Sequence, residues 1–333
     1  MEISQFVLAS RPLGIPSTGN FRIEKTVVSD LNEGEVLLKS WYISVDPYMR
    51  GRMNSVKSYA ASFEIDKPIK GAVVARVIES KSKLFLTGDI VVGTLPWATY
   101  SVEKAENLRK VDTEKVSPGY YLGVLGMPGF TAYIGMMDIC KPVKGETVVV
   151  SGAAGAVGIV AGQIAKIQGA KVIGIAGSEE KCRSLKEQFG YDDALNYNTS
   201  KSLRKEIAVL CPEGIDVYFD NVGGEVTEAV VANLDFHSRI ALCGQISQYN
   251  NSKPALGYTI LPHLLTRSVM LQGFIVSNYS HRFSEALTML SQWLNEGKLK
   301  FSETIVDGFD KLPEAFLGLF SGKNLGKMMV KVE

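Results

Sequence analysis

Closely spaced metal ligands and a disulfide framework are both missing from this sequence. Its 333 residues include only four cysteines, and no two of them form a C-x-x-C pair. The three histidines, His237, His263 and His281, form no H-x-x-x-H pair. Zinc ribbons need such short spacings, and small disulfide-stabilised proteins need more cysteines for their length. We therefore expect no metal site and no disulfide scaffold.

The chain also lacks an excess of one charge and a long hydrophobic run. Lys and Arg number 36 against 35 Asp and Glu, so the net charge is +1 and no basic field attracts nucleic acid or anionic lipid. No apolar run reaches the 18 residues needed to span a bilayer. The first ten residues, MEISQFVLAS, lack the basic region of a signal peptide. We expect a cytoplasmic protein that binds neither nucleic acid nor membrane.

The composition that remains, 46% hydrophobic and 21% charged, is typical of a globular protein, and the length suggests about two domains. Residues 1–125 are rich in short β-branched runs between turn residues, at 34–39, 73–78 and 88–93. Such runs without helices between them predict a β-rich domain. We expect residues 300–333, which contain another strand-like run at 328–332, to complete this domain.

Residues 126–299 instead predict an α/β domain. The apolar run at 147–150 is typical of a parallel strand covered on both faces, and further strands are expected at 171–176, 215–220, 239–243 and 269–274. Helical spacing is clearest at Phe283, Leu287, Leu290 and Leu294, with Gly297 ending the helix. This alternation predicts a doubly wound sheet of six strands with right-handed crossovers.

A glycine-rich turn follows the strand at 147–150. The segment Ser151–Gly158 reads SGAAGAVG and leads into a helical run at 159–168. Such a turn lets the backbone approach a pyrophosphate, whose charge meets the N-terminus of the helix. Ala153 occupies the first glycine position of G-x-G-x-x-G, so we expect Gly155 and Gly158 to form the turn, with Ala156 and Val157 between them. The alternative is a glycine-lined corner without a ligand.

The end of the second expected strand indicates which dinucleotide binds. An Asp or Glu there would bind the ribose 2′-hydroxyl of NAD, but this chain has Gly177 and Ser178, with Lys181 one helical turn later. Without a carboxylate nothing repels a 2′-phosphate, and Lys181 can attract it. We therefore predict that NADPH is preferred over NADH. Alternatively, Lys181 is a solvated helix residue, a reading that the adjacent Glu179 and Glu180 support.

The sequence as a whole resembles the zinc-independent medium-chain dehydrogenase/reductase superfamily, specifically its prostaglandin reductase (leukotriene B4 12-hydroxydehydrogenase) and alkenal double-bond reductase family. The resemblance extends over essentially the whole chain. It is carried by VDPYMR at 45–50, GMPGFTAY at 126–133, AAGAVG at 153–158, FDNVGG at 219–224, CGQISQYN at 243–250 and GKNLGK at 322–327.

This resemblance implies a GroES-like amino-terminal domain and a Rossmann domain, with NADPH bound between them. It also implies that the dinucleotide is lined by Gly155 to Gly158, Lys181, Tyr197, Asn221, Cys243, Gly244, the residues up to Tyr249, Phe274, Ile275, Val276 and Asn324. Each has a simpler alternative: Phe274 to Val276 as strand core, and Asn221 and Asn324 as turn caps. Homodimerisation through the edge of the Rossmann sheet is a further implication.

The resemblance also bears on the chemistry. Zinc-dependent relatives carry Gly-His-Glu where this chain has Gly71-Ala72-Val73, so the catalytic metal site is missing and the alcohol dehydrogenase interpretation loses its Lewis acid. A metal-free NADPH site suits hydride addition to the C=C bond of an α,β-unsaturated aldehyde or ketone. The family assigns stabilisation of the enolate to the cofactor's ribose 2′-hydroxyl, assisted by the tyrosine that matches Tyr249. This residue lies in an expected mobile loop, 245–258, and an exposed loop aromatic is the alternative.

Tyr48 and Met127 are candidate substrate contacts, because apolar and aromatic walls suit lipid-like enones. Arg50 and Arg52 are open between binding a fatty-acid carboxylate and being solvated surface residues. Two other functions also stay open at this point: quinone reduction by an enzyme of the same fold, and NADPH binding without catalysis.

Overall fold

The computed structural model of the chain describes residues 1–28, 30–114, 116–253, 255–257 and 259–332. It divides into two compact units. Unit 1 consists of Met1–Leu122 together with the residues from Glu303 onward, and unit 2 is Gly123–Ser302. The chain therefore passes from one unit to the other twice, after Leu122 and after Ser302.

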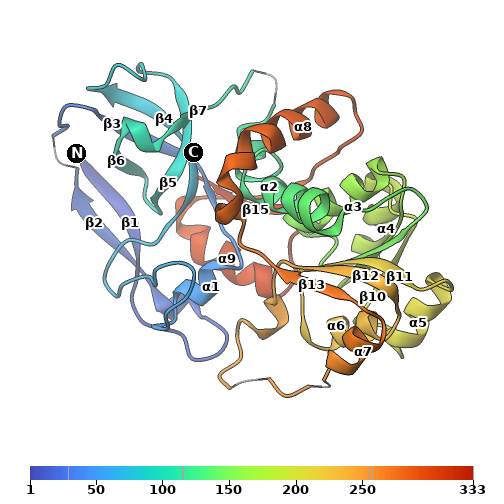
Figure 1. Cartoon of the computed structure of the whole chain (residues 1–333). Helices are drawn as coiled ribbons and strands as arrows, with labels where there is room; N and C mark the ends of the chain where they lie inside the picture. Colours follow the sequence, from blue (N-terminus) through green and yellow to red (C-terminus); the bar gives the residue numbers. More distant parts are fainter. Residues whose placement is uncertain (29, 115, 254, 258, 333) are drawn as a thin grey trace. The chain divides into compact units, whose positions relative to one another are not determined.

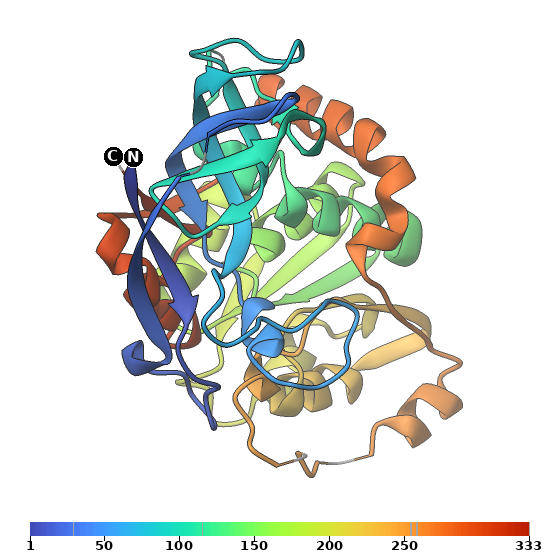
Figure 2. The ribbon, with the colours of Figure 1, turned by 90° about the vertical axis from the view of Figure 1, so that its left-hand side faces the viewer.

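Unit 1 is built mainly of antiparallel strands (Figure 2). In its described part, β1 (Glu2–Leu8) pairs with β2 (Phe21–Val27), and a larger sheet has the strand order β14-β15-β3-β4-β5-β7, with β6 also paired to β3. The strands of the larger sheet are β3 (Glu35–Ser44), β4 (Lys70–Ser80), β5 (Ile90–Pro96), β6 (Tyr100–Lys104), β7 (Arg109–Lys110), β14 (Glu303–Asp307) and β15 (Lys327–Lys331). The described residues of this unit also form the α-helices α1 (Met49–Arg52) and α9 (Leu312–Phe320).

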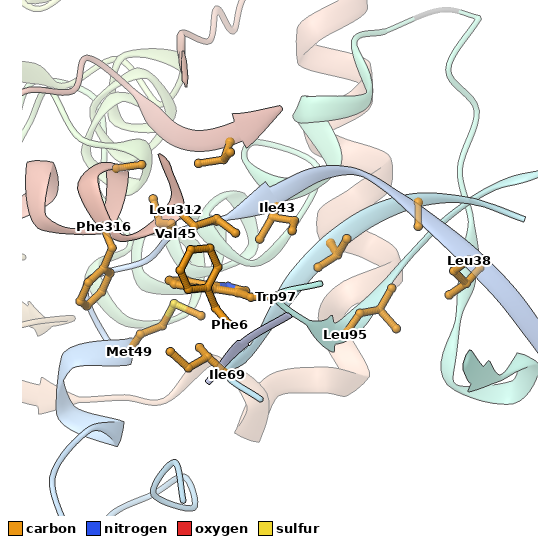
Figure 3. Close-up of a cluster of buried hydrophobic side chains, with 14 of the residues drawn as sticks. Phe6, Leu38, Ile43, Val45, Met49, Ile69, Leu95, Trp97, Leu312 and Phe316 are labelled. Carbon is orange, nitrogen blue, oxygen red and sulfur yellow. The ribbon is translucent and has the colours of Figure 1, made fainter. Parts of the chain in front are cut away.

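The main core of unit 1 lies on one face of this sheet. Side chains alternate along a strand, so Val73, Ala75 and Val77 of β4 all enter this core. Figure 3 shows Trp97 in the same cluster as Met49 of α1 and Phe316 of α9. The Trp97 ring stacks on Phe21 and meets Phe316 edge-on, with centroids 6.2 and 6.3 Å apart. Residues from both ends of the sequence thus complete one core.

Unit 2 contains a parallel sheet with the strand order β10-β9-β8-β11-β12-β13 in the described residues (Figure 1). The strands are β8 (Thr147–Ser151), β9 (Lys171–Ala176), β10 (Asp193–Asn196), β11 (Ile215–Asp220), β12 (Leu234–Leu242) and β13 (Met270–Gly273). The helices are α2 (Met127–Ile134), α3 (Ala156–Ile167), α4 (Glu179–Phe189), α5 (Leu203–Leu210), α6 (Gly224–Val231), α7 (Leu261–Thr266) and α8 (Phe283–Asn295). The order runs outward in opposite directions from β8 and β11, so the switch point lies where these two strands end.

This topology confirms the predicted doubly wound fold. Val148, Val149 and Val150 are fully buried, as expected for a parallel strand covered on both faces. The short strand β10 had no predicted range, because its four residues include Asp193 and Asn196 and give no apolar run. Helix α3 begins at Ala156, three residues before the predicted helical run.

No helix in the described part of the chain is long and apolar enough to cross a membrane. The four cysteines are all free thiols. Among the described residues, no group of three or more His, Cys, Asp or Glu side chains is arranged to hold a metal ion.

Candidate functional site

The turn between β8 and α3 depends on one glycine more than the sequence analysis assigned. Gly152 has φ +57°, a left-handed conformation that residues with a Cβ rarely adopt. Gly155, the N-cap of α3, has an ordinary φ of −84°. The assignment of the turn to Gly155 and Gly158 alone was therefore incomplete, because it left out Gly152. A Cβ at Gly158 would lie 2.4 Å from the Gly152 carbonyl oxygen, and one at Gly155 would lie 3.2 Å from it. The turn is therefore packed backbone against backbone.

Ala153 explains why the motif tolerates a substitution at its first glycine position. Its side chain is fully buried and points toward Gly174 of β9, where an added Cβ would lie 3.1 Å from the Ala153 Cβ. The backbone N–H of Ala153 donates to the carbonyl of Ile175 at 3.1 Å. A glycine in the neighbouring strand thus provides the space that the alanine needs.

A buried tyrosine is hydrogen-bonded to the first turn of α3. The Tyr191 hydroxyl donates to the Gly158 carbonyl at 2.7 Å. Its ring fills the space beside Gly162, where an added Cβ would lie 2.1 Å from the ring. At the other side of the turn, the N-terminal N–H groups of α3 have no side-chain cap, because Gly155 occupies the N-cap. Uncapped N–H groups and the helix dipole together favour an anion at this end.

Asp220, the last residue of β11, connects three of the strand ends and was not singled out from the sequence. Its side chain is fully buried. Its carboxylate accepts hydrogen bonds of 2.6 to 3.3 Å from the side chains of Ser151, Tyr218, Thr227 and Gln245 and from the backbone N–H groups of Val222 and Gly223. A carboxylate that ends an otherwise apolar strand was the available signal. It fixes the ends of β8 and β11 and the segment after β12.

Asn221 lies at the switch point itself. Its side-chain amide donates to the Ser151 carbonyl at 2.8 Å, and its backbone N–H donates to Ser151 Oγ at 3.0 Å. These two bonds join the carboxyl ends of β8 and β11. Within the protein, Asn221 therefore makes the contacts expected of a turn cap. It also lies at the position where doubly wound folds bind ligands.

The end of β9 has an open backbone and a tyrosine beside it. A Cβ at Gly177 would lie 2.8 Å from the Tyr197 hydroxyl oxygen, so this side chain crosses the end of the strand. Tyr197 is 43% exposed. Ser178 caps α4 by accepting the Lys181 N–H at 3.2 Å. The structure thus brings Gly177, Ser178, Lys181 and Tyr197 together.

The charges around Lys181 differ in their contacts. Partial burial lowers the pKa of Lys181, with Glu180 acting in the opposite direction. Glu179 accepts hydrogen bonds from Asn196 Nδ2 at 2.8 Å and from Thr199 Oγ1 at 3.0 Å. Glu179 is thus bonded to residues at and after the end of β10. It therefore gives little support to the alternative that Lys181 is only a solvated helix residue.

The segment after β12 folds back over the end of its strand. The backbone N–H groups of Cys243 and Gly244 both donate to the Asp220 carbonyl, at 2.9 and 3.0 Å. Burial raises the pKa of Cys243 to about 12, so its thiol stays protonated at neutral pH. A Cβ at Gly244 would lie 3.2 Å from the Asn221 carbonyl and 3.2 Å from the Tyr249 hydroxyl. The phenol thus reaches the edge of the sheet.

Tyr249 follows a short 3₁₀ turn, Ile246–Gln248, and its hydroxyl is bonded to the start of the same segment. The Gln245 backbone N–H donates to the Tyr249 hydroxyl oxygen at 3.3 Å. Burial raises the pKa of Tyr249, so the phenol is neutral at physiological pH. Ser247 Oγ donates to the Val222 carbonyl at 2.6 Å, which anchors the turn. Of the expected mobile loop, Pro254 and Tyr258 lie outside the described residues.

Phe274, Ile275 and Val276 follow the last strand of the sheet. Phe274 is 8% exposed and packs edge-on against Phe219, with centroids 6.4 Å apart. The Phe274 side chain is therefore part of the core, as the alternative interpretation expected. Ile275 and Val276 are only half-buried. Met127, the half-buried first residue of α2, also belongs to unit 2.

The remaining candidates, Tyr48, Arg50, Arg52 and Asn324, belong to unit 1. Asn324 donates to the Gly326 carbonyl at 2.8 Å, as expected for a turn cap. Burial and the nearby Asp46 raise the pKa of Tyr48. The interpretation of Arg50 as a solvated surface residue is wrong, because this side chain is only 2% exposed and donates to Asn54 Oδ1 and to the Gly14 carbonyl. Its binding of a fatty-acid carboxylate stays a prediction.

The arrangement in unit 2 can hold a dinucleotide. All six strands end at one edge of the sheet, and a candidate residue follows each of them. The glycine turn at α3 suits a pyrophosphate, and the open end of β9 suits a ribose. Neutral Tyr249 provides a hydroxyl donor at the same edge, beyond the switch point.

Comparison with known proteins agrees with this arrangement. Residues 4–111 match a family described as the N-terminal domain of oxidoreductase, and residues 156–292 match one described as zinc-binding dehydrogenase. The NADPH-dependent curcumin reductase of Escherichia coli (strain K12) is 43% identical over 333 residues, which cover 98% of this chain and 96% of that protein. Prostaglandin reductase 1 of Rattus norvegicus is 44% identical over 322 residues, which cover 96% of this chain and 95% of that protein. The crystal structure of CurA in complex with NADPH from Vibrio vulnificus has a TM-score of 0.94 and 42% identity, and covers 99% of both chains.

Proposed function

Because this chain belongs to the zinc-independent medium-chain dehydrogenase/reductases, in the family of the NADP-dependent prostaglandin and curcumin reductases, we propose that it reduces the C=C bond of α,β-unsaturated aldehydes and ketones with NADPH. The observation that supports this most is the neutral Tyr249 hydroxyl at the same sheet edge as the phosphate-binding turn. A dinucleotide site and an uncharged hydrogen-bond donor for the enolate oxygen are what metal-free reduction of an enone requires.

The residues of unit 2 suit NADPH in their chemistry. Gly152, Gly155 and Gly158 keep side chains away from the N-terminus of α3, where the pyrophosphate binds. Gly177 leaves the end of β9 without a carboxylate, and Tyr197 lies beside it. Tyr197 and Lys181, in the first turn of the following helix, would hold the 2′-phosphate. The adjacent backbone of Asn221 and Gly244 lines the path toward the nicotinamide.

When bound, NADPH would supply the hydride that adds to the β-carbon of the substrate, which shifts the C=C electron pair onto the carbonyl oxygen as an enolate. A proton from solvent then adds to the α-carbon and completes the reduction. Tyr249 donates its hydroxyl proton to a hydrogen bond with that oxygen. The Gln245 N–H donates to the phenol oxygen, so the phenol's own proton is not used in this bond. Since burial raises the pKa of Tyr249, the phenol keeps its proton throughout the physiological range. A donor placed before the reaction stabilises the transition state more than the ground state.

Tyr48 and Met127 provide the apolar contacts to the substrate. Tyr48 is largely buried and its pKa is raised, so it binds as a neutral aromatic side chain. Met127 stands at the start of α2, and its flexible thioether accommodates substrates of different shape. Aromatic and thioether contacts favour hydrophobic enones over small hydroxy acids or sugars.

A direct test measures NADPH oxidation with a panel of enals, enones, 15-oxo-prostaglandins and quinones, with and without a chelator. We expect enones to give the highest kcat/KM, and EDTA to leave it unchanged. Tyr249→Phe should lower kcat and kcat/KM together by about 10- to 10³-fold, with little effect on NADPH affinity. A preference for quinones would support the alternative oxidoreductase. NADPH binding without turnover of any compound would reject catalysis.

We also propose a homodimer joined through β13. This strand is an edge of its sheet, and Met270 and Leu271 on it are 43% and 38% exposed. Phe236, on the neighbouring strand β12, and Leu265, in α7, are also exposed. An open parallel edge with apolar side chains is suited to pairing with a second copy. Light scattering should give a molar mass twice that of one chain, and Leu271→Lys should reduce the measured mass to that of one chain.

A cytoplasmic location is proposed from the four free cysteines. Cys140, Cys182 and Cys211 are buried thiols, and Cys243 is half-buried. Free thiols are typical of a reducing compartment. Cell fractionation with an antibody to the protein tests this assignment.

A further inference from the structure

Gln245 begins the turn that leads to Tyr249, and the proposed reaction gives its side chain no role. The residue is half-buried and is the N-cap of the 3₁₀ turn Ile246–Gln248, which follows the end of β12. Its backbone N–H donates to the Tyr249 hydroxyl oxygen at 3.3 Å. The position of Gln245 therefore determines where the phenol oxygen is held.

The side chain of Gln245 extends toward the buried carboxylate of Asp220. Its Nε2 donates to Asp220 Oδ2 at 3.3 Å, and the same oxygen atom accepts the Thr227 hydroxyl at 2.6 Å. Asp220 is fully buried, so each donor to its carboxylate offsets part of the cost of burying the charge. Gln245 thus makes two different bonds, one from its side chain to this carboxylate and one from its backbone to the Tyr249 hydroxyl.

The segment after β11 has room for this amide only because it contains two glycines. Gly223 has φ +77°, and a Cβ there would lie 2.3 Å from Gln245 Oε1 and 2.9 Å from Nε2. Gly224 has φ +58°, and a Cβ there would lie 3.1 Å from Ser247 Oγ. Side chains at both positions are therefore disfavoured by the backbone conformation and by the turn that lies against them. The glycines of FDNVGG thus accommodate two side chains of CGQISQYN, a relation that neither motif reveals alone.

The backbone on the two sides of Gln245 differs in its freedom. After it, the turn is held by bonds such as that from the Ile246 N–H to the Asn221 carbonyl at 3.3 Å. Before it stands Gly244, and the N–H that meets Tyr249 belongs to the peptide that joins Gly244 to Gln245. Glycine allows more backbone conformations than any other residue. The bond from the Gln245 side chain therefore restricts the orientation of this peptide.

We propose that Gln245 is a positioning residue for the reduction: its side-chain amide, bonded to Asp220 and lying over Gly223, fixes the backbone N–H that holds the Tyr249 hydroxyl. This inference rests on the proposed function, in which that hydroxyl donates to the enolate oxygen. Gln245 acts through Tyr249 and needs no contact with the substrate. Loss of its amide should therefore slow the chemical step, and should have no effect once the phenol hydroxyl is absent.

The test is a double-mutant cycle of Gln245→Leu and Tyr249→Phe, with NADPH oxidation by 3-buten-2-one as the assay. Leucine is similar in size to glutamine but cannot donate to Asp220. We expect Gln245→Leu to lower kcat by about 10-fold and to leave the dissociation constant of NADPH within about 2-fold of the wild-type value. In the Tyr249→Phe background, the same substitution should change kcat by less than about 2-fold, because the group that it positions is already missing.

Gln245→Glu tests the inference even where Gln245→Leu does not fold. A glutamate has the length of glutamine but donates to Asp220 only when it is protonated, and the neighbouring carboxylate favours its protonated form. Relative to the wild type at the same pH, its kcat should be low at about pH 8 and should recover toward about pH 6. Tyr249 remains neutral over this range, because burial raises its pKa.

The matched control is Gln292→Leu. This glutamine also donates from Nε2 to a carboxylate, Glu296 Oε1 at 2.6 Å, but it lies on the exposed surface of α8. The substitution therefore removes a bond of the same kind away from the turn. We expect no change in kcat or in NADPH affinity for this control.

Three outcomes would overturn the inference. Additive losses in the cycle would mean that Gln245 acts independently of the Tyr249 hydroxyl, and weaker NADPH binding with an unchanged kcat would make it a cofactor contact. An unchanged kcat in both Gln245 variants would show that the turn needs no side-chain bond. The proposed function is tested separately in the same cycle. If the wild type reduces no enone, or if Tyr249→Phe equals the wild type, the proposed function fails and the inference fails with it, whereas a loss in Tyr249→Phe without a loss in Gln245→Leu rejects the inference alone.

Discussion

The two units hold their candidate residues by different physical means. In unit 2, the strand ends themselves determine where residues lie, and backbone groups and the buried Asp220 join them. In unit 1, Tyr48 lies beside loops whose backbone is held by side chains, chiefly Arg11 and Arg50. The first arrangement follows from topology and varies little with side chains. The second depends on individual long side chains, so we expect single substitutions to tune it.

The largest effect should come from Asp220→Ala, which removes the acceptor at the centre of the unit 2 site. Several buried donors, including the Val222 and Gly223 N–H groups, then lose their partner. We expect a loss of about 3 kcal/mol or more in the free energy of unfolding, and weaker NADPH binding. Urea denaturation measures the first and fluorescence titration the second. Glu33→Ala, at an exposed carboxylate of unit 1, is the control and should change the stability by less than about 0.5 kcal/mol.

Next in size is Gly158→Ala, which tests whether backbone packing alone maintains the phosphate-binding turn. The added Cβ would lie 2.4 Å from a carbonyl oxygen of the turn and 2.6 Å from the Ala153 Cα, so the backbone must shift. We expect NADPH affinity to fall by about 100-fold, measured by calorimetry. Gly155→Ala meets its nearest atom at 3.2 Å and should cost less than about 10-fold. Equal effects of the two variants would contradict the packing argument.

A smaller and more selective change is expected from Lys181→Ala. Only NADPH carries the 2′-phosphate, so kcat/KM should fall for NADPH and not for NADH, changing their ratio by about 30-fold. A loss shared by both cofactors would indicate damage to the fold. Gly177→Asp is a less clean test, because its Cβ would meet the Tyr197 hydroxyl at 2.8 Å and displace that ring.

The smallest effect contrasts two carboxyl groups whose pKa values shift in opposite directions. Burial raises the pKa of Glu303 in unit 1, although Ser117 donates to it at 3.3 Å. Its ionisation therefore opposes folding, and stability declines as the pH rises above the ordinary pKa of a glutamate. Glu303→Gln should raise the melting temperature at pH 7 relative to the wild type and leave it unchanged at pH 4. The corresponding gain in the free energy of unfolding at pH 7 should be less than about 1 kcal/mol.

In unit 2 the sign is reversed. Arg282, and after it Tyr133, lower the pKa of Glu285 to about 2. The ionised group favours folding above pH 4.5, and this contribution disappears as the pH falls toward 2. Glu285→Gln should therefore lower the melting temperature at pH 7, with the difference vanishing near pH 2. Parallel pH profiles for the two variants would refute the assignment of opposite signs.

The same contrast explains what sequence reasoning could find. Apolar runs and glycine spacing predicted the doubly wound sheet and the turn at Gly155 and Gly158, because both depend on local pattern. Gly152 was missed as part of that turn, since only its φ of +57° reveals the requirement. Asp220 was quoted only within a motif, because a buried carboxylate is recognised by the donors around it, which come from four different parts of the chain.

Unit 1 was less predictable for a related reason. Short β-branched runs predicted strands near β3, β4 and β5, but nothing in the pattern distinguishes a buried arginine from a solvated one. The carbonyl groups that Arg50 contacts lie 36 and 38 residues before it in the sequence. Long-range contacts of this kind leave no periodicity, so the position of the loop that contains Pro12 and Gly14 required the structure.

The contribution of α9 to the core of unit 1 has a consequence for synthesis of the protein. Leu312 and Phe316 pack with Phe21 and Trp97, yet they leave the ribosome after the whole of unit 2. Unit 2 is continuous in sequence and can fold as soon as it emerges, whereas the first 122 residues wait with part of their core uncovered. The interval is the time needed to translate about 190 residues, on the order of 10 to 40 seconds at bacterial or eukaryotic rates. During it the nascent amino-terminal segment presents Trp97 and its neighbours to chaperones, and a chain released before Leu312 never covers them.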